Sequence, residues 1–187
     1  MSLYKPQISH IGKCSYSFSD LYVANPQQTV IGSFVSIGKG VVIGHGTHPQ
    51  NYLSTSPYLY LDRLEYKTSD TLSHGEWENL EPVYIGNDVW IGDNVWIKNG
   101  VKIGDGAILG ANALITKDVP AYAIMVGTPA HILRYRFTPD IIERLLKTKW
   151  WNLPDEIIKQ IPYDNISKAL NFLENIAHNE SKNDGKR

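Results

Sequence analysis

The sequence predicts an all-β fold, a parallel β-solenoid of short strands, with an extruded loop and a C-terminal α-helical extension. Three observations predict it: a six-residue repeat of aliphatic residues, two blocks of that repeat in one phase, and a helix-like pattern after residue 138. The 187 residues are enough for one main domain with an appendage.

Aliphatic residues recur every six positions in two blocks of the chain, and many of them are followed by Gly. The interval from Ile43 to Ile85 is seven times six, so the two blocks share one phase. A period of six differs from the periods of a helix and of a hairpin strand. The aliphatic positions are Ile31, Ile37, Ile43, Ile85, Ile91, Ile97, Ile103, Leu109 and Ile115.

Each repeat is expected to supply one short strand and one tight turn. The aliphatic residue and the small or β-branched residue four positions later should point inward. Three strands should close one coil, and stacked coils should form a parallel solenoid. Gly, Asn and Asp near the corners tolerate the positive φ of a tight turn. A β-sandwich is the alternative, but its strands share no six-residue phase.

The β-helix domain is expected to occupy residues 1–137, with an extruded arm at about residues 49–84. The arm breaks the period and carries Pro49, Pro57, Pro82 and several aromatic residues. A long segment without repeats indicates functional use.

The two ends of the chain depart from the repeat. Ile11-Gly12 is out of phase with Ile31, so residues 1–30 are expected to form an irregular first coil. Thr138-Pro139 matches an N-cap and a first helical position, which opens a helical extension over residues 138–178. Residues 179–187 form a polar tail.

Charge and composition exclude several classes of partner. The net charge of −1 offers no basic excess for nucleic-acid phosphates. No apolar stretch approaches the roughly 20 residues of a membrane span, and the N-terminus does not resemble a signal peptide. Cys14 is the only cysteine, which fits a reducing compartment. We therefore expect a cytoplasmic protein without nucleic-acid partners or membrane insertion.

Three strings carry a resemblance to a known family: Gly44-His45-Gly46-Thr47-His48-Pro49, Ile85-Gly86-Asn87-Asp88-Val89-Trp90-Ile91-Gly92 and Val126-Gly127-Thr128-Pro129-Ala130. With them, residues 30–137 and Lys149-Trp150-Trp151-Asn152 resemble the hexapeptide-repeat acyltransferases. The similar branch is the xenobiotic and sugar O-acetyltransferases, which includes chloramphenicol, streptogramin and galactoside acetyltransferases.

The resemblance implies a single-stranded left-handed parallel β-helix, against the usual right-handed crossover rule. It also implies a homotrimer with active sites between subunits, an arm that folds over a neighbouring subunit, and acetyl-CoA as co-substrate.

His48 is the candidate catalytic residue, because it matches the family's catalytic His-Pro. Acetyl transfer to an alcohol requires a base that removes the hydroxyl proton. Histidine suits that role because its unperturbed pKa, about 6.5, leaves it mostly neutral near pH 7. Without the repeat and the arm, a lone histidine in a turn is most often a solvated residue.

The resemblance also assigns residues to acetyl-CoA. Small residues would allow close approach of the pantetheine, a carboxylate would contact its thiol-end amide, and cations would face the phosphates. His131 stands where the family commonly has Arg, which weakens that contact. The assigned residues are Asp93, Gly110, Ala111, Thr116, Lys117, His131 and Arg134.

The acceptor site is expected to involve the corner and the arm, with His45, Tyr52, His74 and Trp77 as candidates. His45, His48 and His74 could also suggest a metal site. No further cysteine or paired carboxylate completes a ligand set, and direct acyl transfer needs no metal, so none is expected.

Three other features bear on the chemistry and the packing. Cys14 could act as a nucleophile, but a buried structural thiol is favoured, and with it direct attack in a ternary complex. Trp90 and Trp96 are expected to face outward at a subunit interface. Trp150-Trp151 is expected to dock the C-terminal segment onto the coils.

The favoured function is O-acetylation of a sugar or glycan precursor, with a small-molecule or glycan hydroxyl as acceptor. Acetylation of an antibiotic hydroxyl is the alternative. N-acetylation of an amino-sugar and a non-catalytic scaffold remain open, although His48-Pro49 and Lys117 argue against a scaffold.

Overall fold

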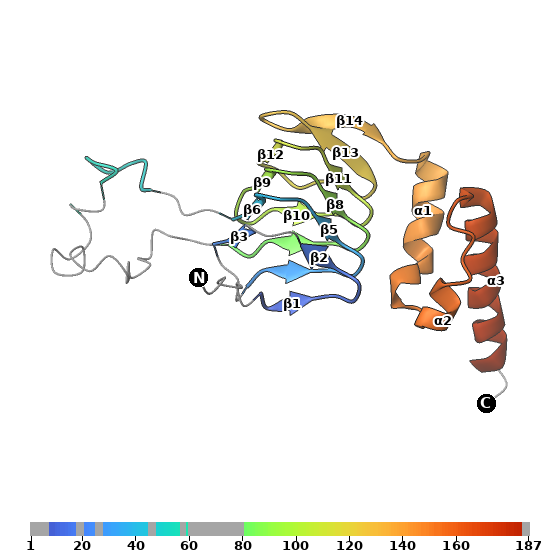
Figure 1. Ribbon diagram of the computed structural model, residues 1–187. Helices are drawn as coiled ribbons and strands as arrows, with labels where there is room; N and C mark the ends of the chain where they lie inside the picture. Colours follow the sequence, from blue (N-terminus) through green and yellow to red (C-terminus); the bar gives the residue numbers. More distant parts are fainter. Residues whose placement is uncertain are drawn as a thin grey trace.

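The computed structural model describes residues 8–17, 21–24, 28–44, 48–56, 59 and 81–184. In this part of the chain, short strands stack into a solenoid with helices beside it (Figure 1). The all-β solenoid and the helical extension expected from the sequence are both present.

The strands form three sheets, which the chain visits in the order A, B, C on each coil. Sheet A contains β1 (His10–Ile11), β4 (Val30–Ile31), β7 (Tyr84–Ile85) and β10 (Lys102–Ile103). Sheet C contains β3 (Tyr22–Val23), β6 (Val42–Ile43), β9 (Trp96–Ile97) and β12 (Leu114–Ile115). Sheet B contains β2 (Tyr16–Ser17), β5 (Ser36–Ile37), β8 (Trp90–Ile91), β11 (Ile108–Leu109), β13 (Ala123–Val126) and β14 (His131–Tyr135).

The core follows the six-residue pattern. In the two-residue strands of the second to fourth coils, the second residue is buried and the first is exposed or half-buried, because successive side chains of a strand point to opposite faces. The residue four positions after each aliphatic is also buried wherever the structure describes it. These inner positions form one core, which includes Ile31, Val35, Ile43, Val89, Ile97, Val101, Leu109 and Ile115.

The shared phase of the two blocks is confirmed by the pairing of strands. Ile31 pairs with Ile85, and Ile43 pairs with Ile97, all in parallel register. The chain therefore leaves the solenoid after β6 and re-enters at β7 without disturbing the stack, so the arm is an insertion in one corner.

The first coil supplies one strand to each sheet, so its expected irregularity is limited to the spacing at one corner. Ile11 pairs with Ile31, and Val23 pairs with Ile43. The strands of this coil keep the six-residue spacing. The two extra residues fall in the corner between Val23 and Ile31, where a longer turn is accommodated without moving the core positions.

Glycine directly after the aliphatic residue mostly serves close packing; among the described residues, only Gly44 has the positive φ expected at this position. Positive φ occurs at Gly40, Asn94 and Asn112, two positions later. A Cβ on Gly86 would lie 2.8 Å from the backbone nitrogen of Asp105 in the next coil. Stacked backbones thus exclude a side chain at this position, whereas the tight turn comes afterwards.

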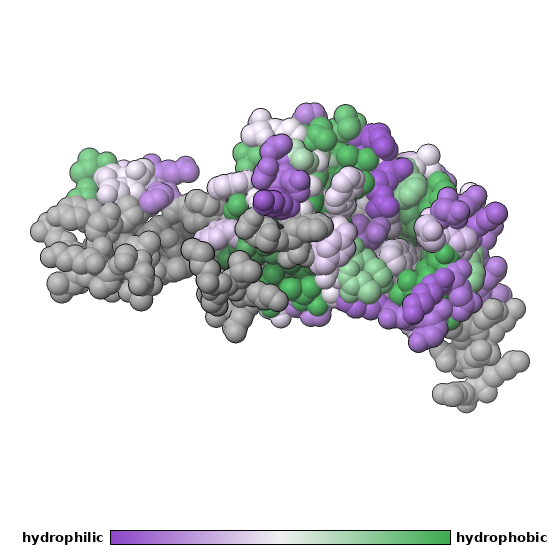
Figure 2. All heavy atoms as spheres, in the orientation of Figure 1, coloured by the Kyte–Doolittle hydropathy of each residue, from purple (hydrophilic) through white to green (hydrophobic). Residues whose placement is uncertain are grey.

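The top of the solenoid is closed by an antiparallel pair. β13 continues sheet B, and β14 returns along it with a register irregularity beside Ile124 and Met125. The turn between them contains the cis peptide Thr128–Pro129. Figure 2 shows hydrophobic residues on the visible surface at this end, where Ile132 and Leu133 are exposed.

The helical extension consists of α1 (Pro139–Thr148), a 3₁₀ turn (Trp150–Asn152), α2 (Asp155–Ile158) and α3 (Ile166–Asp184). Thr138 is the N-cap of α1 with Pro139 at its start, as expected. α3 runs to Asp184, beyond the boundary expected at residue 178. No helix in the described ranges is both long and apolar enough to cross a bilayer.

The extension packs on one corner of the solenoid. Trp151 is buried, and the rings of Trp150 and Phe34 lie 5.0 Å apart. Lys13 Nζ donates to Asp155 Oδ1 at 2.8 Å, which ties the first coil to α2. The docking role expected of the two tryptophans is confirmed.

Candidate active site

Most of the predicted coenzyme residues border sheet C. Asp93, Gly110 and Ala111 lie in the corner that leads from sheet B to sheet C, called here the B–C corner. Thr116 and Lys117 follow β12 and lie in the corner that leads from sheet C to sheet A, the C–A corner. The fold therefore brings both groups to the two edges of one sheet.

Asp93 has a structural role in its corner. Its Oδ1 accepts the backbone N–H of Lys39 from the coil below at 2.8 Å. The side chain is exposed, and a contact with a pantetheine amide would use the other oxygen. Corner side chains of Asn87 and Asp105 accept backbone N–H groups in the same way.

Gly110 is small for a reason within the chain itself. A Cβ there would lie 3.0 Å from Val126 Cγ1 and 3.2 Å from the carbonyl oxygen of Met125. The space that a side chain at Gly110 would occupy thus lies toward the top of the solenoid and not in an open groove. Ala111 is exposed, so a pantetheine chain could approach its backbone closely.

Lys117 is exposed and Thr116 is half-buried. In sheet C, β12 is two strands away from β6, at whose end the arm begins. Two strand spacings amount to about 10 Å. A ligand extended along the C–A corner could therefore reach from the start of the arm to Lys117.

His131 and Arg134 lie on β14, at the top of sheet B, and both are exposed. His131 pairs with Val126 beside the turn, whereas Arg134 pairs with Ile124 near the other end of the strand. Arg134 Nη1 donates to the carbonyl oxygen of Tyr135 at 3.1 Å. The strand thus separates these two residues along its length.

His48 lies where the chain leaves the solenoid. Gly44 N, at the end of β6, still donates to the carbonyl oxygen of Ile97 at 2.8 Å. Four residues later the imidazole of His48 is exposed, while the following Pro49 is buried. Along the chain, the base candidate therefore follows β6 of sheet C, just as Lys117 follows β12 of the same sheet.

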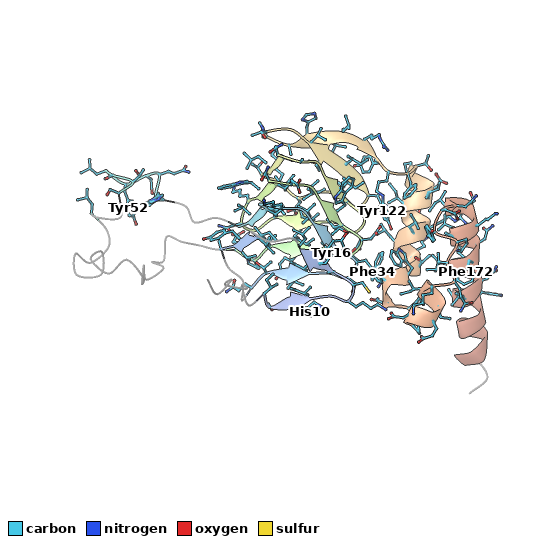
Figure 3. All side chains as sticks on the ribbon, in the orientation of Figure 1. His10, Tyr16, Phe34, Tyr52, Tyr122 and Phe172 are labelled. Atoms are coloured by element: carbon cyan, nitrogen blue, oxygen red, sulfur yellow. The ribbon has the colours of Figure 1, made fainter. Side chains whose placement is uncertain are left out.

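The acceptor candidates are only partly described. Tyr52 is exposed, 54% of its surface being accessible, and Figure 3 places it in the arm, away from the solenoid. His45, His74 and Trp77 lie outside the described residues.

The outer faces of the sheets carry exposed aromatic residues. Trp90 and Trp96 point outward with 57% and 43% of their surface accessible. Tyr16 and Tyr22 occupy the equivalent outward positions of the first coil. The outward orientation expected of the tryptophans is confirmed.

Cys14 is exposed, so the expectation of a buried thiol is wrong. It lies in a corner, where the residue turns outward with φ of 58°. Within the described ranges, no group of three or more His, Cys, Asp and Glu side chains is arranged to hold a metal ion.

Comparison with known proteins adds independent findings. The family described as "Bacterial transferase hexapeptide (six repeats)" matches residues 82–117. A chloramphenicol acetyltransferase of Agrobacterium fabrum is 43% identical over 140 residues, covering 70% of this chain and 62% of that protein. A probable macrolide acetyltransferase of Lysinibacillus sphaericus is 36% identical over 159 residues, covering 83% of this chain and 85% of that protein. The chain thus spans less than two thirds of the chloramphenicol acetyltransferase and most of the macrolide one.

Solved structures show the same fold. A hexapeptide-repeat acetyltransferase of Vibrio cholerae, complexed with acetyl coenzyme A, superposes with a TM-score of 0.53 at 26% identity, over 71% of this chain and 73% of that one. A maltose O-acetyltransferase of Clostridium difficile gives a TM-score of 0.51 at 25% identity, over 68% of this chain and 59% of that one.

Proposed function

Because the chain belongs to the hexapeptide-repeat acetyltransferases, we propose that it transfers an acetyl group from acetyl-CoA to a hydroxyl, with His48 as general base. The observation that carries the proposal is the position of His48. It follows β6 of sheet C at the start of the arm, and Lys117 follows β12 of the same sheet. A bound coenzyme complex in a related structure supports the donor.

The chemistry is a direct transfer in a ternary complex. The acceptor oxygen attacks the thioester carbonyl carbon while the imidazole of His48 takes the hydroxyl proton. The carbon–sulfur bond then breaks, and the proton passes from the imidazolium to the departing thiolate. The products are the acetyl ester and CoA with its free thiol. No covalent enzyme intermediate is needed.

The coenzyme is proposed to lie along sheet C. Ala111 would allow the pantetheine to approach the backbone, and Asp93 would accept an amide N–H through its second oxygen. Lys117 and Arg134 are the cations proposed for the phosphate end. His131 would add a weaker contact beside the turn at the top.

The proposed acceptor is an antibiotic hydroxyl. The sugar acceptor favoured by the sequence gives way, because relatives named as chloramphenicol and macrolide acetyltransferases share 43% and 36% identity. The likeness to a maltose O-acetyltransferase is weaker, at 25% identity. Tyr52 and the arm are proposed to line this acceptor site, together with His45, His74 and Trp77.

A cytoplasmic homotrimer of left-handed β-helices is part of the proposal. The exposed aromatic residues on sheets B and C, among them Trp90 and Trp96, support contact with a second copy, since large apolar patches mark interaction sites. His48 and the coenzyme groove would then meet at a seam between subunits.

The test is turnover of acetyl-CoA, monitored through the release of free thiol, with chloramphenicol, a macrolide, a streptogramin and maltose as acceptors. His48→Ala should lower kcat at least ~100-fold, the lower end of general-base catalysis, with the Kd for CoA unchanged. His178→Ala, an exposed histidine on α3, is the matched control and should retain full activity. An active His48→Ala enzyme would refute the role, and turnover with maltose alone would refute the acceptor.

A further inference from the structure

A cavity of about 390 Å³ lies between the solenoid and the helical extension. This volume is within the range of small-molecule sites. Aromatic side chains of Phe34, Tyr122, Phe137 and Trp150 form much of its wall. Figure 3 shows Phe34 and Tyr122 on the side of the solenoid that faces the helices. His48 is not among the lining residues, and it follows β6, away from the corner that carries Phe34 and Tyr122.

On the solenoid side, the cavity is lined by Phe34, Asp88 and Tyr122, which belong to one row of corner residues. These residues follow one another in the stacked turns from sheet A to sheet B, called here the A–B corner. They share φ values of 55–69°, in the left-handed region, where bulky side chains are uncommon. The row comprises Cys14, Phe34, Asp88, Gly106 and Tyr122.

Gly106 leaves room for the ring of Tyr122, since a Cβ there would collide with that ring. Bulky side chains in this conformation store strain, which is a feature of ligand-binding regions.

Tyr122 brings an unsatisfied hydrogen-bond donor to this wall. Only 1% of the residue is exposed, and its hydroxyl has no hydrogen-bond acceptor among the described residues. Burial, with Asp88 nearby, raises the pKa of Tyr122, so the hydroxyl keeps its proton. The neighbouring Trp150 indole can only donate and cannot accept that proton. A buried polar hydrogen without an acceptor is costly and calls for a partner.

The charge near the hydroxyl is already balanced. Arg136 Nη1 donates to Asp88 Oδ2 at 2.9 Å and to the carbonyl oxygen of Gly106 at 2.8 Å. The guanidinium also lies over the rings of Tyr122 and Phe137, at 5.3 and 5.4 Å from their centroids. An added anion would face the Asp88 carboxylate, and an added cation would face the guanidinium. The lining therefore favours an uncharged ligand.

We propose that this cavity binds a small, uncharged, mostly apolar molecule whose acceptor oxygen takes a hydrogen bond from the Tyr122 hydroxyl. The aromatic wall supplies apolar contact, and the buried hydroxyl selects for an oxygen at one end. The site is separate from the acetyl-transfer site, and the proposal does not rest on that activity.

The test uses two nearly isosteric probes, acetophenone and α-methylstyrene, which carries a methylene in place of the carbonyl oxygen. Binding is followed by NMR of isoleucine methyl groups in the full-length protein. Ile158 and Ile161 line the cavity and should shift saturably, whereas Ile91 in the solenoid core should not. Acetophenone should bind several-fold more tightly than α-methylstyrene.

Two variants test the mechanism of binding. Tyr122→Phe should weaken acetophenone binding about 5-fold, the effect of one hydrogen bond, and leave α-methylstyrene unchanged. Ala169→Leu, which fills the cavity from α3, should abolish binding of both probes. The proposal is overturned if neither probe shifts Ile158 and Ile161 in the wild type. Equal binding of the two probes, or equal effects of Tyr122→Phe on both, would also overturn it.

Discussion

Gly104→Ala is expected to destabilise the solenoid far more than the same change at Gly110. Both glycines follow an aliphatic residue at the same place in the repeat, and neither has a positive φ. At Gly104 a Cβ would lie 2.5 Å from the backbone nitrogen of Ala121 and 2.8 Å from its Cα. At Gly110 the nearest atom is the side-chain Cγ1 of Val126, at 3.0 Å.

The difference between backbone and side-chain neighbours sets the magnitude. Overpacking against atoms that cannot move costs about 1–3 kcal/mol. Gly→Ala at a compatible φ also stabilises by about 0.4–1 kcal/mol, because the unfolded chain loses freedom. At Gly110, a small shift of Val126 relieves the nearest contact. The carbonyl oxygen of Met125, at 3.2 Å, has to move much less than the backbone of Ala121 at Gly104, so the two effects nearly cancel. Gly104→Ala should therefore be less stable than Gly110→Ala by about 2 kcal/mol.

Urea unfolding at one fixed protein concentration measures this difference, since the stability of an oligomer depends on concentration. The slope m should be the same for both variants, so that the midpoints report stability. If Gly104→Ala unfolds at the same midpoint as Gly110→Ala, stacked backbones do not explain glycine at this position of the repeat.

Three further outcomes are expected. Ala111→Leu should raise the KM for acetyl-CoA about 10-fold without a change in unfolding midpoint, whereas Gly110→Ala should leave that KM unchanged; the reverse result would move the pantetheine contact. Tyr122→Phe should unfold at the same or higher urea concentration, because it removes a buried donor without an acceptor; a lower midpoint would reveal an acceptor in the apo protein. The hydrogen bond from Lys13 lowers the pKa of Asp155 below its ordinary 3.8, so stability from this pair should be present above that value and disappear as the pH falls through the lower pKa. Lys13→Met should flatten this pH dependence in urea unfolding, and an unchanged profile would argue against the ion pair.

The regular part of the fold was predictable because each inward side chain is selected by its own place in the repeat. Ile31, Ile85 and Ile103 stack in sheet A, and each contacts only the coils next to it. A periodic sequence therefore determines the register of every coil, even across the arm. The repeat also predicts that Ile11 pairs with Ile31, provided that the corner after Val23 is given two extra residues.

The purpose of individual residues was harder to predict than their position. Glycine after the aliphatic is compatible with both a positive φ and a close approach, and the sequence does not distinguish these causes. Gly110 was likewise assigned to the coenzyme, although Val126 accounts for its small size. Cys14 was expected inside because cysteine is usually buried, but its corner directs it outward.

The sequence contains one feature related to the cavity beside Tyr122, namely the large residues at the A–B corner. Composition alone does not explain them. Where the B–C corner has Gly40, Asn94 and Asn112, the A–B corner has Phe34 and Tyr122 in the same left-handed conformation. A large residue in the left-handed conformation costs about 1–2 kcal/mol of conformational free energy. Favourable contacts elsewhere must offset this cost.

Each of the three corner rows of the solenoid has a different structural role. At the A–B corner, contact with the helical extension is what offsets the strain: Phe34 packs on Trp150, and Tyr122 packs on Phe137. The C–A corner opens into the arm that carries His48. The helices dock on the A–B corner, so the B–C and C–A corners and sheet C between them remain for a coenzyme and for a neighbouring subunit. We propose that the seam between subunits runs along sheet C, where Trp96 is 43% exposed.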